Sequence, residues 1–574
     1  MSKKESIIYP TLKTEYIEEM DKKIPWNEYP RPSMVRNSFL CLNGEWDFCV
    51  SYGEREKIEY KEKILVPFPP ESLLSGIERQ IPEGSLMHYR RRFNLPDGFN
   101  KGRVILHFGA VDTICSVLIN GRLAVSHEGG YLPFSADITE LICEGENEIY
   151  VEARDDLSGL YPYGKQKRER GGMWYTPVSG IWQTVWLESV PEKYIEKIKI
   201  TSTADNVKIK IFGGERHKTI TLDEGGIYEL DGDEITISPI DKHLWTPHHP
   251  HLYYFTVKSG EDEIRSYFAL REIAVERIKG VPRLTLNGRA YLFNGLLDQG
   301  YYPDGIFLPA TSRGYEDDIL RMKKCGFNML RKHIKIEPEI FYHLCDKHGM
   351  VVFQDMVNNS DYSWLIDTAL PTIGFKRLPI LIRHRDKETR QIFERDMIGT
   401  IEHLYNFPSV LYYTIFNEGW GQFEADRMYL VAKNQDPTRI YDSTSGWFRR
   451  RRSDVDSRHV YFKRVRIGRR DGRPIVISEF GGYSHRVKGH LFGESEYGYG
   501  GYETAKEYEA ALIKLYAEEI RPLIRGGICA LVYTQVSDVE DETNGLITYD
   551  RRILKPDAKA LRTVMEELYS EMNK

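Results

Sequence analysis

Hydrophobic and polar positions alternate over short distances in residues 1–190. Runs such as 104–108 and 116–119 lie between turn signals, and Asn120-Gly121 follows the second run. Asn-Gly between two apolar runs is a strong signal of a β-hairpin. Many short strands without a convincing helix predict a jelly-roll β-sandwich.

Residues 191–280 continue the β pattern on a smaller scale. Alternating runs occupy 195–201 and 207–212, and Gly225-Gly226 marks a turn. A stretch of about 90 residues with this strand spacing fits an immunoglobulin-like β-sandwich.

From residue 281 to residue 574, strands alternate with amphipathic helices. Helices are expected at Arg313–Cys325 and Pro338–His348, with Gly349 ending the second. The expected strands are continuous apolar runs, as strands buried on both faces should be. They occupy residues 291–297, 327–331, 351–355, 411–416, 440–444, 458–461, 475–478 and 528–534. Eight such strands predict a (β/α)8 TIM barrel.

Composition and charge narrow the class of protein. The chain has 574 residues, of which 41% are hydrophobic and 29% charged, as in a folded multidomain protein. A net charge of −6 disfavours nucleic acid and membrane surfaces as partners. Seven irregularly spaced cysteines without a CxxC pair disfavour a disulfide framework or a thiolate metal site. With no signal-peptide core and no long apolar run, we expect a cytoplasmic protein.

Two glutamates come directly after expected barrel strands. Glu418 follows strand four and Glu479 ends strand seven. Catalytic residues of such barrels lie at the C-terminal ends of the strands. Glycoside hydrolysis needs two carboxyl groups there, because one protonates the leaving oxygen and the other attacks the anomeric carbon or activates water. A salt bridge at the rim would explain a single such glutamate, but not two.

The residues around both glutamates carry a family resemblance. Asn417-Glu418-Gly419-Trp420 and Ser478-Glu479-Phe480-Gly481-Gly482 resemble the barrel motifs of glycoside hydrolase family two, which contains β-galactosidases, β-glucuronidases and β-mannosidases. Residues 42–48, 66–72 and 171–175 are similar to its sugar-binding-fold domain, and 244–247 to the end of its immunoglobulin-like domain. The resemblance covers nearly the whole chain.

The resemblance implies a role for each site residue. Glu418 would be the acid/base and Glu479 the nucleophile of a double displacement with retention, which requires no metal and no cofactor. Asn417 would bind the sugar 2-hydroxyl, and Tyr461 would lie close to the nucleophile. Substrate-contacting positions also fall on Arg331, His333 and Asp355. A nearby arginine and a tyrosine hydrogen bond would keep the nucleophile ionised.

An arginine run beyond strand five bears on the identity of the sugar. Trp447-Phe448 leads into Arg449, Arg450, Arg451 and Arg452, for which a uronate carboxylate would be a suitable counter-ion. We therefore expect an exo-acting β-hexuronidase that cleaves a β-glucuronide or β-galacturonide. Leu546 stands where family β-glucuronidases carry the lysine of an Asn-x-Lys motif. A β-galactosidase and an inactive glycan-binding protein remain the alternatives.

Four loops complete the expectations. Lys165–Arg170 is basic and is either solvated or part of the barrel mouth, and the acidic residues 538–542 are expected to be solvated. The long loops Asn358–Gly374 and Ser484–Tyr502 carry aromatic residues and are expected to border the sugar pocket. The arginine run 449–452 could instead be a solvated loop or contact a neighbouring subunit, so a homo-oligomer is left open.

Overall fold

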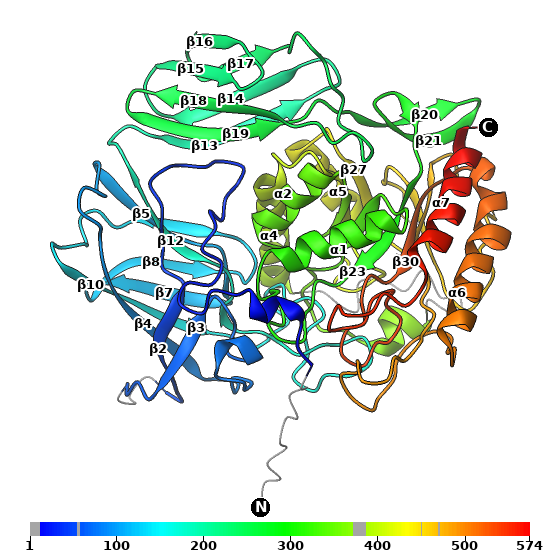
Figure 1. The fold of residues 1–574 in the computed structure, drawn as a ribbon, viewed down its shortest axis with the longest axis horizontal. Coiled ribbons are helices and arrows are strands. Elements are labelled where there is room, and N and C mark those ends of the chain that lie inside the picture. The colour runs from blue at the N-terminus through cyan, green and yellow to red at the C-terminus, as the bar shows by residue number, and fades with distance from the viewer. Residues whose placement is uncertain (1–11, 54–57, 371–385, 449, 469–470, 574) are drawn as a thin grey trace, which may run out of the picture.

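The N-terminal strands form two antiparallel sheets, drawn in blue and cyan in Figure 1. The computed structural model describes residues 12–53, 58–370, 386–448, 450–468 and 471–573. The sheet orders are β3-β2-β4-β10-β7-β8 and β1-β12-β5-β9, with β6 and β11 as a separate pair. The strands are β1 (Leu40–Cys41), β2 (Gly44–Ser51), β3 (Glu62–Val66), β4 (Leu86–Asn94), β5 (Arg103–Phe108), β6 (Val111–Asp112), β7 (Ile114–Ile119), β8 (Arg122–Glu128), β9 (Phe134–Asp137), β10 (Glu146–Arg154), β11 (Gly180–Ile181) and β12 (Val185–Val190). The alternating apolar residues form one buried core, which confirms the predicted N-terminal sandwich.

The next strands form two smaller antiparallel sheets at the top of Figure 1. Their orders are β13-β14-β17 and β16-β15-β18-β19. The strands are β13 (Ile195–Ser202), β14 (Val207–Gly213), β15 (His217–Leu222), β16 (Ile227–Asp231), β17 (Glu234–Ile237), β18 (Tyr253–Ser259) and β19 (Asp262–Phe268). A third sheet contains β20 (Ile273–Ile278), β21 (Val281–Leu286) and β22 (Arg289–Ala290) and leads into the barrel.

Eight parallel strands form the barrel, in the order β27-β26-β25-β24-β23-β30-β29-β28, and β27 contacts β28. They are β23 (Phe293–Asp298), β24 (Met329–Lys332), β25 (Val351–Asp355), β26 (Val410–Phe416), β27 (Ile440–Thr444), β28 (Asp456–Val460), β29 (Ile475–Gly481) and β30 (Ile528–Thr534). Nearly all of their residues are buried, because helices cover the outer face and side chains fill the inside. The predicted TIM barrel and its strands are confirmed.

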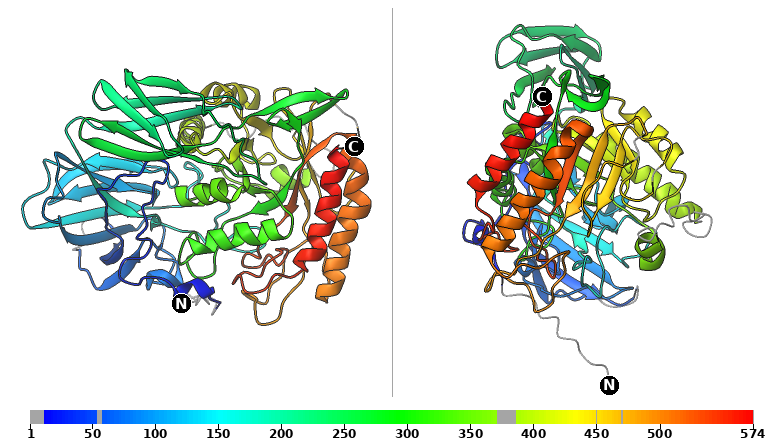
Figure 2. Two further views of the ribbon diagram at one scale, coloured as in Figure 1. Left: turned by 45° about the horizontal axis from the view of Figure 1, so that its top comes forward. Right: turned by 90° about the vertical axis from the view of Figure 1, so that its right-hand side faces the viewer.

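Helices flank the barrel strands on the outside, as Figure 2 shows. The α-helices are α1 (Arg313–Lys324), α2 (Glu339–His348), α4 (Lys387–Leu404), α5 (Ala425–Gln435), α6 (Ala505–Lys514) and α7 (Ala558–Asn573). Shorter helical segments are η1 (Glu15–Glu18), η2 (Leu73–Ser75), η3 (Trp364–Ala369), η5 (Leu515–Ile520) and η6 (Arg521–Gly526). None of the helices in the described ranges combines the length and the apolar character needed to cross a bilayer.

A loop of the sandwich, residues 155–179, reaches the C-terminal ends of the barrel strands, and we call it the mouth loop. The backbone N–H groups of Tyr163 and Gly164 both donate to the carbonyl oxygen of Asn358, at 3.1 and 3.2 Å. Gly164 has φ +68°, and a Cβ atom there would lie 2.8 Å from the oxygen of Ile334. Such close contact between main chains requires glycine and fixes the mouth loop on the barrel.

A buried cluster of charges joins the sandwich to the middle sheets. Arg36 donates to both carboxylate oxygens of Asp262 on β19 at 2.9 Å, and to Glu188 on β12 at 3.3 Å. Arg31 donates to both oxygens of Glu188 at 2.9 Å. Burial would raise the pKa of Glu188, but Arg31, His107 and Arg36 hold it well below its usual range. The two units are therefore linked by ion pairs as well as by packing.

Candidate active site

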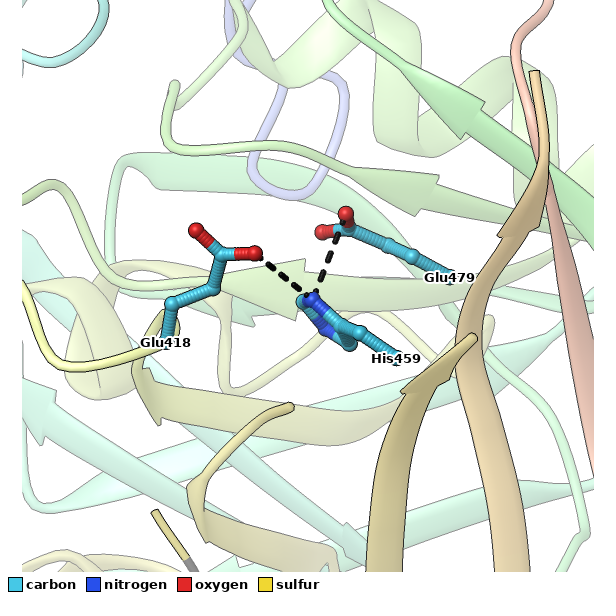
Figure 3. A group of neighbouring side chains, drawn as sticks. All are labelled: Glu418, His459 and Glu479. Atoms are coloured by element: carbon cyan, nitrogen blue, oxygen red, sulfur yellow. Dashed lines mark hydrogen bonds and ion pairs between the residues drawn. The ribbon is translucent and has the colours of Figure 1, made fainter. Parts of the chain in front are cut away.

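Two barrel strands bring the predicted glutamates together (Figure 3). Glu418 follows β26 and Glu479 lies near the end of β29. One oxygen of each carboxylate lies within 4.8 Å of the other. Retaining glycosidases hold their two carboxyl groups about 5–5.5 Å apart, whereas inverting enzymes hold them about 6.5–9.5 Å apart. The spacing therefore favours the retaining geometry.

The turn after β26 aims Glu418 into the barrel mouth. Glu418 has φ +61°, a left-handed conformation that costs energy in a residue with a Cβ atom. The next residue, Gly419, lies against the ring of Phe448, and a Cβ atom there would lie 2.3 Å from that ring. The indole N–H of Trp420 donates to the oxygen of Ser360 at 2.7 Å. These contacts fix the strained turn in place.

The buried guanidinium of Arg331, at the end of β24, connects the site residues. It donates to Asp355 at 2.9 Å, to Glu479 at 3.0 Å and to the side-chain oxygen of Asn417 at 3.0 Å. Ser445 donates to the same Asn417 oxygen at 2.8 Å. Because these donors occupy the amide oxygen of Asn417, its NH2 group is the part left to bind a sugar hydroxyl.

The surroundings of Glu479 favour its ionised form. Tyr461 donates to Glu479 Oε2 at 2.7 Å, while Arg331 binds Oε1. Burial alone would raise the pKa of Glu479, but its interactions with His459 and Arg331, together with His333 and Lys165, lower it to about 2. A carboxylate with this pKa is ionised at neutral pH, as a nucleophile must be.

His459 is a site residue that the sequence motifs did not indicate. Its Nδ1 atom lies 2.9 Å from Glu418 and 3.4 Å from Glu479, between the two carboxylates in Figure 3. The indole ring of Trp447 packs edge-on against the imidazole, with ring centroids 5.8 Å apart. His459 stands two residues before Tyr461, and side chains two apart on a strand point to the same face. The two-residue spacing from Tyr461 is the sequence feature that could have indicated His459 as a site residue.

Glu418, His459 and Glu479 form the one group in the described part of the chain whose spacing would admit a metal ion. Their N–O distances of 2.9 and 3.4 Å are those of a hydrogen bond and an ion pair. A hydrogen bond and an ion pair among the three side chains are sufficient to explain their spacing.

His333 and Asp355 form a second polar pair at the mouth. The Nδ1 atom of His333 lies 2.6 Å from Asp355 Oδ2. Burial and the charge of Lys165 lower the pKa of His333 to about 4, so the ring is neutral at pH 7. Its Nε2 atom is buried and has no hydrogen-bond partner among the described residues. A neutral ring that donates from Nδ1 has an acceptor at Nε2, which a sugar hydroxyl can satisfy.

The described arginines of the run 449–452 do not all point toward the carboxylates of Glu418 and Glu479. Arg449 lies outside the described residues. Arg450 donates to the amide oxygen of Gln422 from Nε at 2.5 Å and from Nη2 at 2.9 Å, in the amide orientation that satisfies both atoms. Arg451 and Arg452 are exposed. A carboxylate-binding role for the run stays a prediction.

Aromatic residues line the rim of the mouth. Tyr499, in the loop after β29, stacks on Tyr461 with ring centroids 4.2 Å apart. Tyr362, in the loop after β25, packs against Trp174 of the mouth loop at 4.9 Å and against Trp420 at 6.0 Å. Both long loops thus border the site, except that residues 371–374 lie outside the described ranges.

The acidic loop after β30 is buried, so the expectation of a solvated loop was wrong. Glu540 and Glu542 are 4% and 3% exposed. Glu540 accepts a hydrogen bond from the backbone of Thr176 at 2.9 Å, and Glu542 accepts one from Tyr175. Because both donors belong to the mouth loop, these carboxylates anchor it to the barrel.

Known proteins share both the barrel and the sandwich. Residues 278–569 match the model of the glycosyl hydrolases family 2 TIM barrel domain, and residues 78–180 match the model described as glycosyl hydrolase 2 galactose-binding domain-like. A β-galactosidase of Aeromonas hydrophila is 27% identical over an alignment of 435 residues, which covers 69% of this chain and 39% of that protein. The chain spans about two fifths of the length of the first curated relatives that it matches.

Solved structures resemble the chain over almost its whole length. A β-glucuronidase of Ruminococcus gnavus has a TM-score of 0.75 at 17% identity and covers 94% of this chain and 98% of its own. A β-galacturonidase of Eisenbergiella tayi bound to galacturonate has a TM-score of 0.66 at 19% identity, with 93% and 97% covered. At these identities the likeness establishes a common fold.

Proposed function

The chain belongs to glycosyl hydrolase family 2, and from that premise we propose that it is an exo-acting retaining β-glycosidase. The observation that carries the proposal is the carboxylate pair, in which one oxygen of Glu418 and one of Glu479 lie within 4.8 Å of each other. The contacts of Arg331 and Tyr461 with Glu479 support its role as the nucleophile.

In the proposed reaction, Glu479 attacks the anomeric carbon while Glu418 gives its proton to the leaving glycosidic oxygen. A glycosyl ester forms on Glu479, and the aglycone leaves. Glu418, now ionised, takes a proton from water, and the resulting hydroxide attacks the same carbon. Glu479 is released and Glu418 is again protonated. Asn417 and His333 are placed to hold sugar hydroxyls during both steps.

We propose a β-hexuronide, either a glucuronide or a galacturonide, as the substrate class. Similar folds in proteins named β-glucuronidase and β-galacturonidase support this choice, as do the cationic side chains around the mouth. A β-galactoside is the second candidate, because the first curated relatives are named β-galactosidases.

Three further features stay proposals. The middle sheets would form an immunoglobulin-like domain over residues 191–280, between the sandwich of 1–190 and the barrel of 281–574. A cytoplasmic location and a homo-oligomeric state are expected from the sequence alone. Cell fractionation and light scattering of the purified protein would test these last two.

Hydrolysis of a panel of nitrophenyl β-glycosides tests the function. We expect release of nitrophenol from the β-glucuronide or the β-galacturonide, and none from the α-anomers. Preference for the β-galactoside would favour the second candidate. Binding of glycosides without turnover of any of them would instead identify an inactive glycan-binding protein. Glu479→Gln serves as the inactive control.

A further inference from the structure

Lys165 is a cation at the barrel mouth that belongs to the sandwich rather than to the barrel. Its carbonyl oxygen accepts from the N–H of Tyr175 at 2.9 Å. On one side, Gly164 is bound to the oxygen of Asn358 at 3.2 Å. On the other, the side chain of Gln166, which is 1% exposed, donates to Tyr163 at 2.8 Å. The side chain of Lys165 therefore extends from a fixed backbone.

The neighbours of Lys165 place it above the same mouth as the carboxylate pair. Gly164 lies against the oxygen of Ile334, next to His333 after β24. Tyr175, paired with the Lys165 backbone, donates its hydroxyl to Glu542 after β30. Strands β24 and β30 are the two neighbours of β23 in the barrel. Lys165 therefore lies between Gly164, which contacts the chain after β24, and Tyr175, which contacts the chain after β30.

Electrostatic effects agree with this position. Burial lowers the pKa of His333, and the charge of Lys165 lowers it further. Burial raises the pKa of Glu542, and Lys165 opposes that rise. Lys165 is also among the cations that lower the pKa of Glu479. Its ammonium group is thus within electrostatic reach of the nucleophile.

Among the described residues, the charge of Lys165 has no partner, although this side chain is partly buried. Neither a hydrogen bond nor an ion pair involves its ammonium group within the described ranges. Other cations nearby are paired: Arg170 lies 3.7 Å from Glu540 and 3.5 Å from Asp541, and Arg331 binds two carboxylates. A partly desolvated cation gains most from an anion brought by a ligand.

We propose that Lys165 forms an ion pair with the carboxylate of a terminal β-uronide whose anomeric carbon faces Glu479. The inference rests on the proposed function, because it assumes a glycosidase site. It assigns the choice between a uronide and a neutral hexoside to the mouth loop. The catalytic carboxylates on β26 and β29 would then cleave whichever sugar the mouth loop retains.

The test compares Lys165→Met with Lys165→Arg in the full chain. Loss of a hydrogen bond to a charged group should lower kcat/KM on the nitrophenyl uronide by about 10- to 150-fold in Lys165→Met. The matching neutral hexoside should change much less, because it offers no carboxylate. Lys165→Arg keeps the charge and should retain more uronide activity. Lys167→Met, an exposed lysine in the same loop, is the matched control and should leave the ratio unchanged.

The ratio of the two substrates separates failure of this inference from failure of the proposed function. A wild type that cleaves the uronide, with an unchanged ratio in Lys165→Met, would overturn the inference and leave the glycosidase proposal intact. A wild type that cleaves only neutral hexosides would overturn the uronide assignment and the role of Lys165 together.

Calorimetry with glucuronate and galacturonate gives a readout that does not depend on turnover. We expect either acid to bind the wild type more tightly than it binds Lys165→Met. Equal binding to both proteins would refute the ion pair even if the chain hydrolyses no glycoside.

Discussion

At the scale of single residues, Glu418 and Glu479 have different partners, so the same substitution should affect them differently. Glu479→Gln should abolish cleavage of every substrate, because an amide cannot form the glycosyl ester. Glu418→Gln should lose about 10²- to 10⁴-fold on poor leaving groups but still cleave nitrophenyl glycosides, which need little protonation. Stopped-flow release of nitrophenol measures the cleavage step. Equal losses on all substrates would show that the two roles are misassigned.

The pH dependence of activity tests the hydrogen bond from Tyr461 to Glu479, which is 2.7 Å long. The pKa of Glu479 lies below its usual value, so the carboxylate stays ionised until the pH falls to about 2. Tyr461→Phe removes a bond to the charged form, and the pKa should rise. In a plot of kcat/KM against pH, the limb on the acid side should therefore move to higher pH by about 1–2 units.

Tyr429→Phe is the control for this substitution. Tyr429, on α5, donates to Asp454 over the same 2.7 Å but away from the carboxylate pair. Its removal should leave the acid limb in place. A shift of equal size in both variants would mean that the limb does not report Glu479.

At the scale of elements, Gly481 ends β29 and Gly482 follows it, both with positive φ, and Gly482 limits the position of an aromatic ring. A Cβ atom on Gly482, at φ +76°, would lie 2.3 Å from Tyr499, which stacks on Tyr461. Gly482→Ala should therefore displace that stack and lower kcat/KM by about 10- to 100-fold. Backbone strain should also cost about 1–2 kcal/mol of stability.

Gly489→Ala is a matched variant in the same loop. Gly489 has φ +87°, but a Cβ atom there would meet nothing within 4 Å. Gly489→Ala should lose about as much stability as Gly482→Ala, as measured by the thermal midpoint of unfolding, but it should keep its activity. If both variants lost activity alike, strain rather than the ring contact would be the cause.

Element patterns also explain what could be predicted. The barrel strands are recognisable because burial on both faces leaves continuous apolar runs. Arg331, Asp355 and Asn417 stand at or just after strand ends, and the family resemblance identified them there as candidate site residues. Contacts between distant segments leave no such trace: a run of acidic residues around Glu542 is typical of a solvated loop until Tyr175 of another domain is seen to bind it. For the same reason, the sequence left Lys165 open between a solvated loop and the barrel mouth.

At the scale of the whole molecule, the ion pairs of Arg36 should stabilise the contact between the sandwich and the middle sheets. The side chains of Arg36, Glu188 and Asp262 are 4%, 1% and 4% exposed. Arg36→Met would leave two buried carboxylates without this partner and should lower the free energy of unfolding by about 3–5 kcal/mol at pH 7. Urea unfolding followed by fluorescence measures the loss.

The effect should depend on pH in a defined direction. The folded-state pKa of Glu188 is depressed, so its stabilisation is complete above the unfolded value of about 4.3 and is lost as the pH falls below it. The difference in the free energy of unfolding between wild type and Arg36→Met should therefore become smaller below that pH. Arg92→Met, which removes an exposed pair with Glu148, should cost less than about 1 kcal/mol at any pH. If the difference between wild type and Arg36→Met did not change with pH, the ion pair of Arg36 with Glu188 would not be its cause.

The mouth loop has a consequence for how such a protein can diverge. Its residues are encoded within the stretch for the sandwich, yet they contact the barrel mouth, whose carboxylates are encoded more than 200 codons downstream. Recombination that exchanged the barrel alone would keep the carboxylate pair and place it beside the mouth loop of another protein. Selection could instead alter the accepted sugar through changes in residues 155–179, without touching the codons for Glu418 or Glu479.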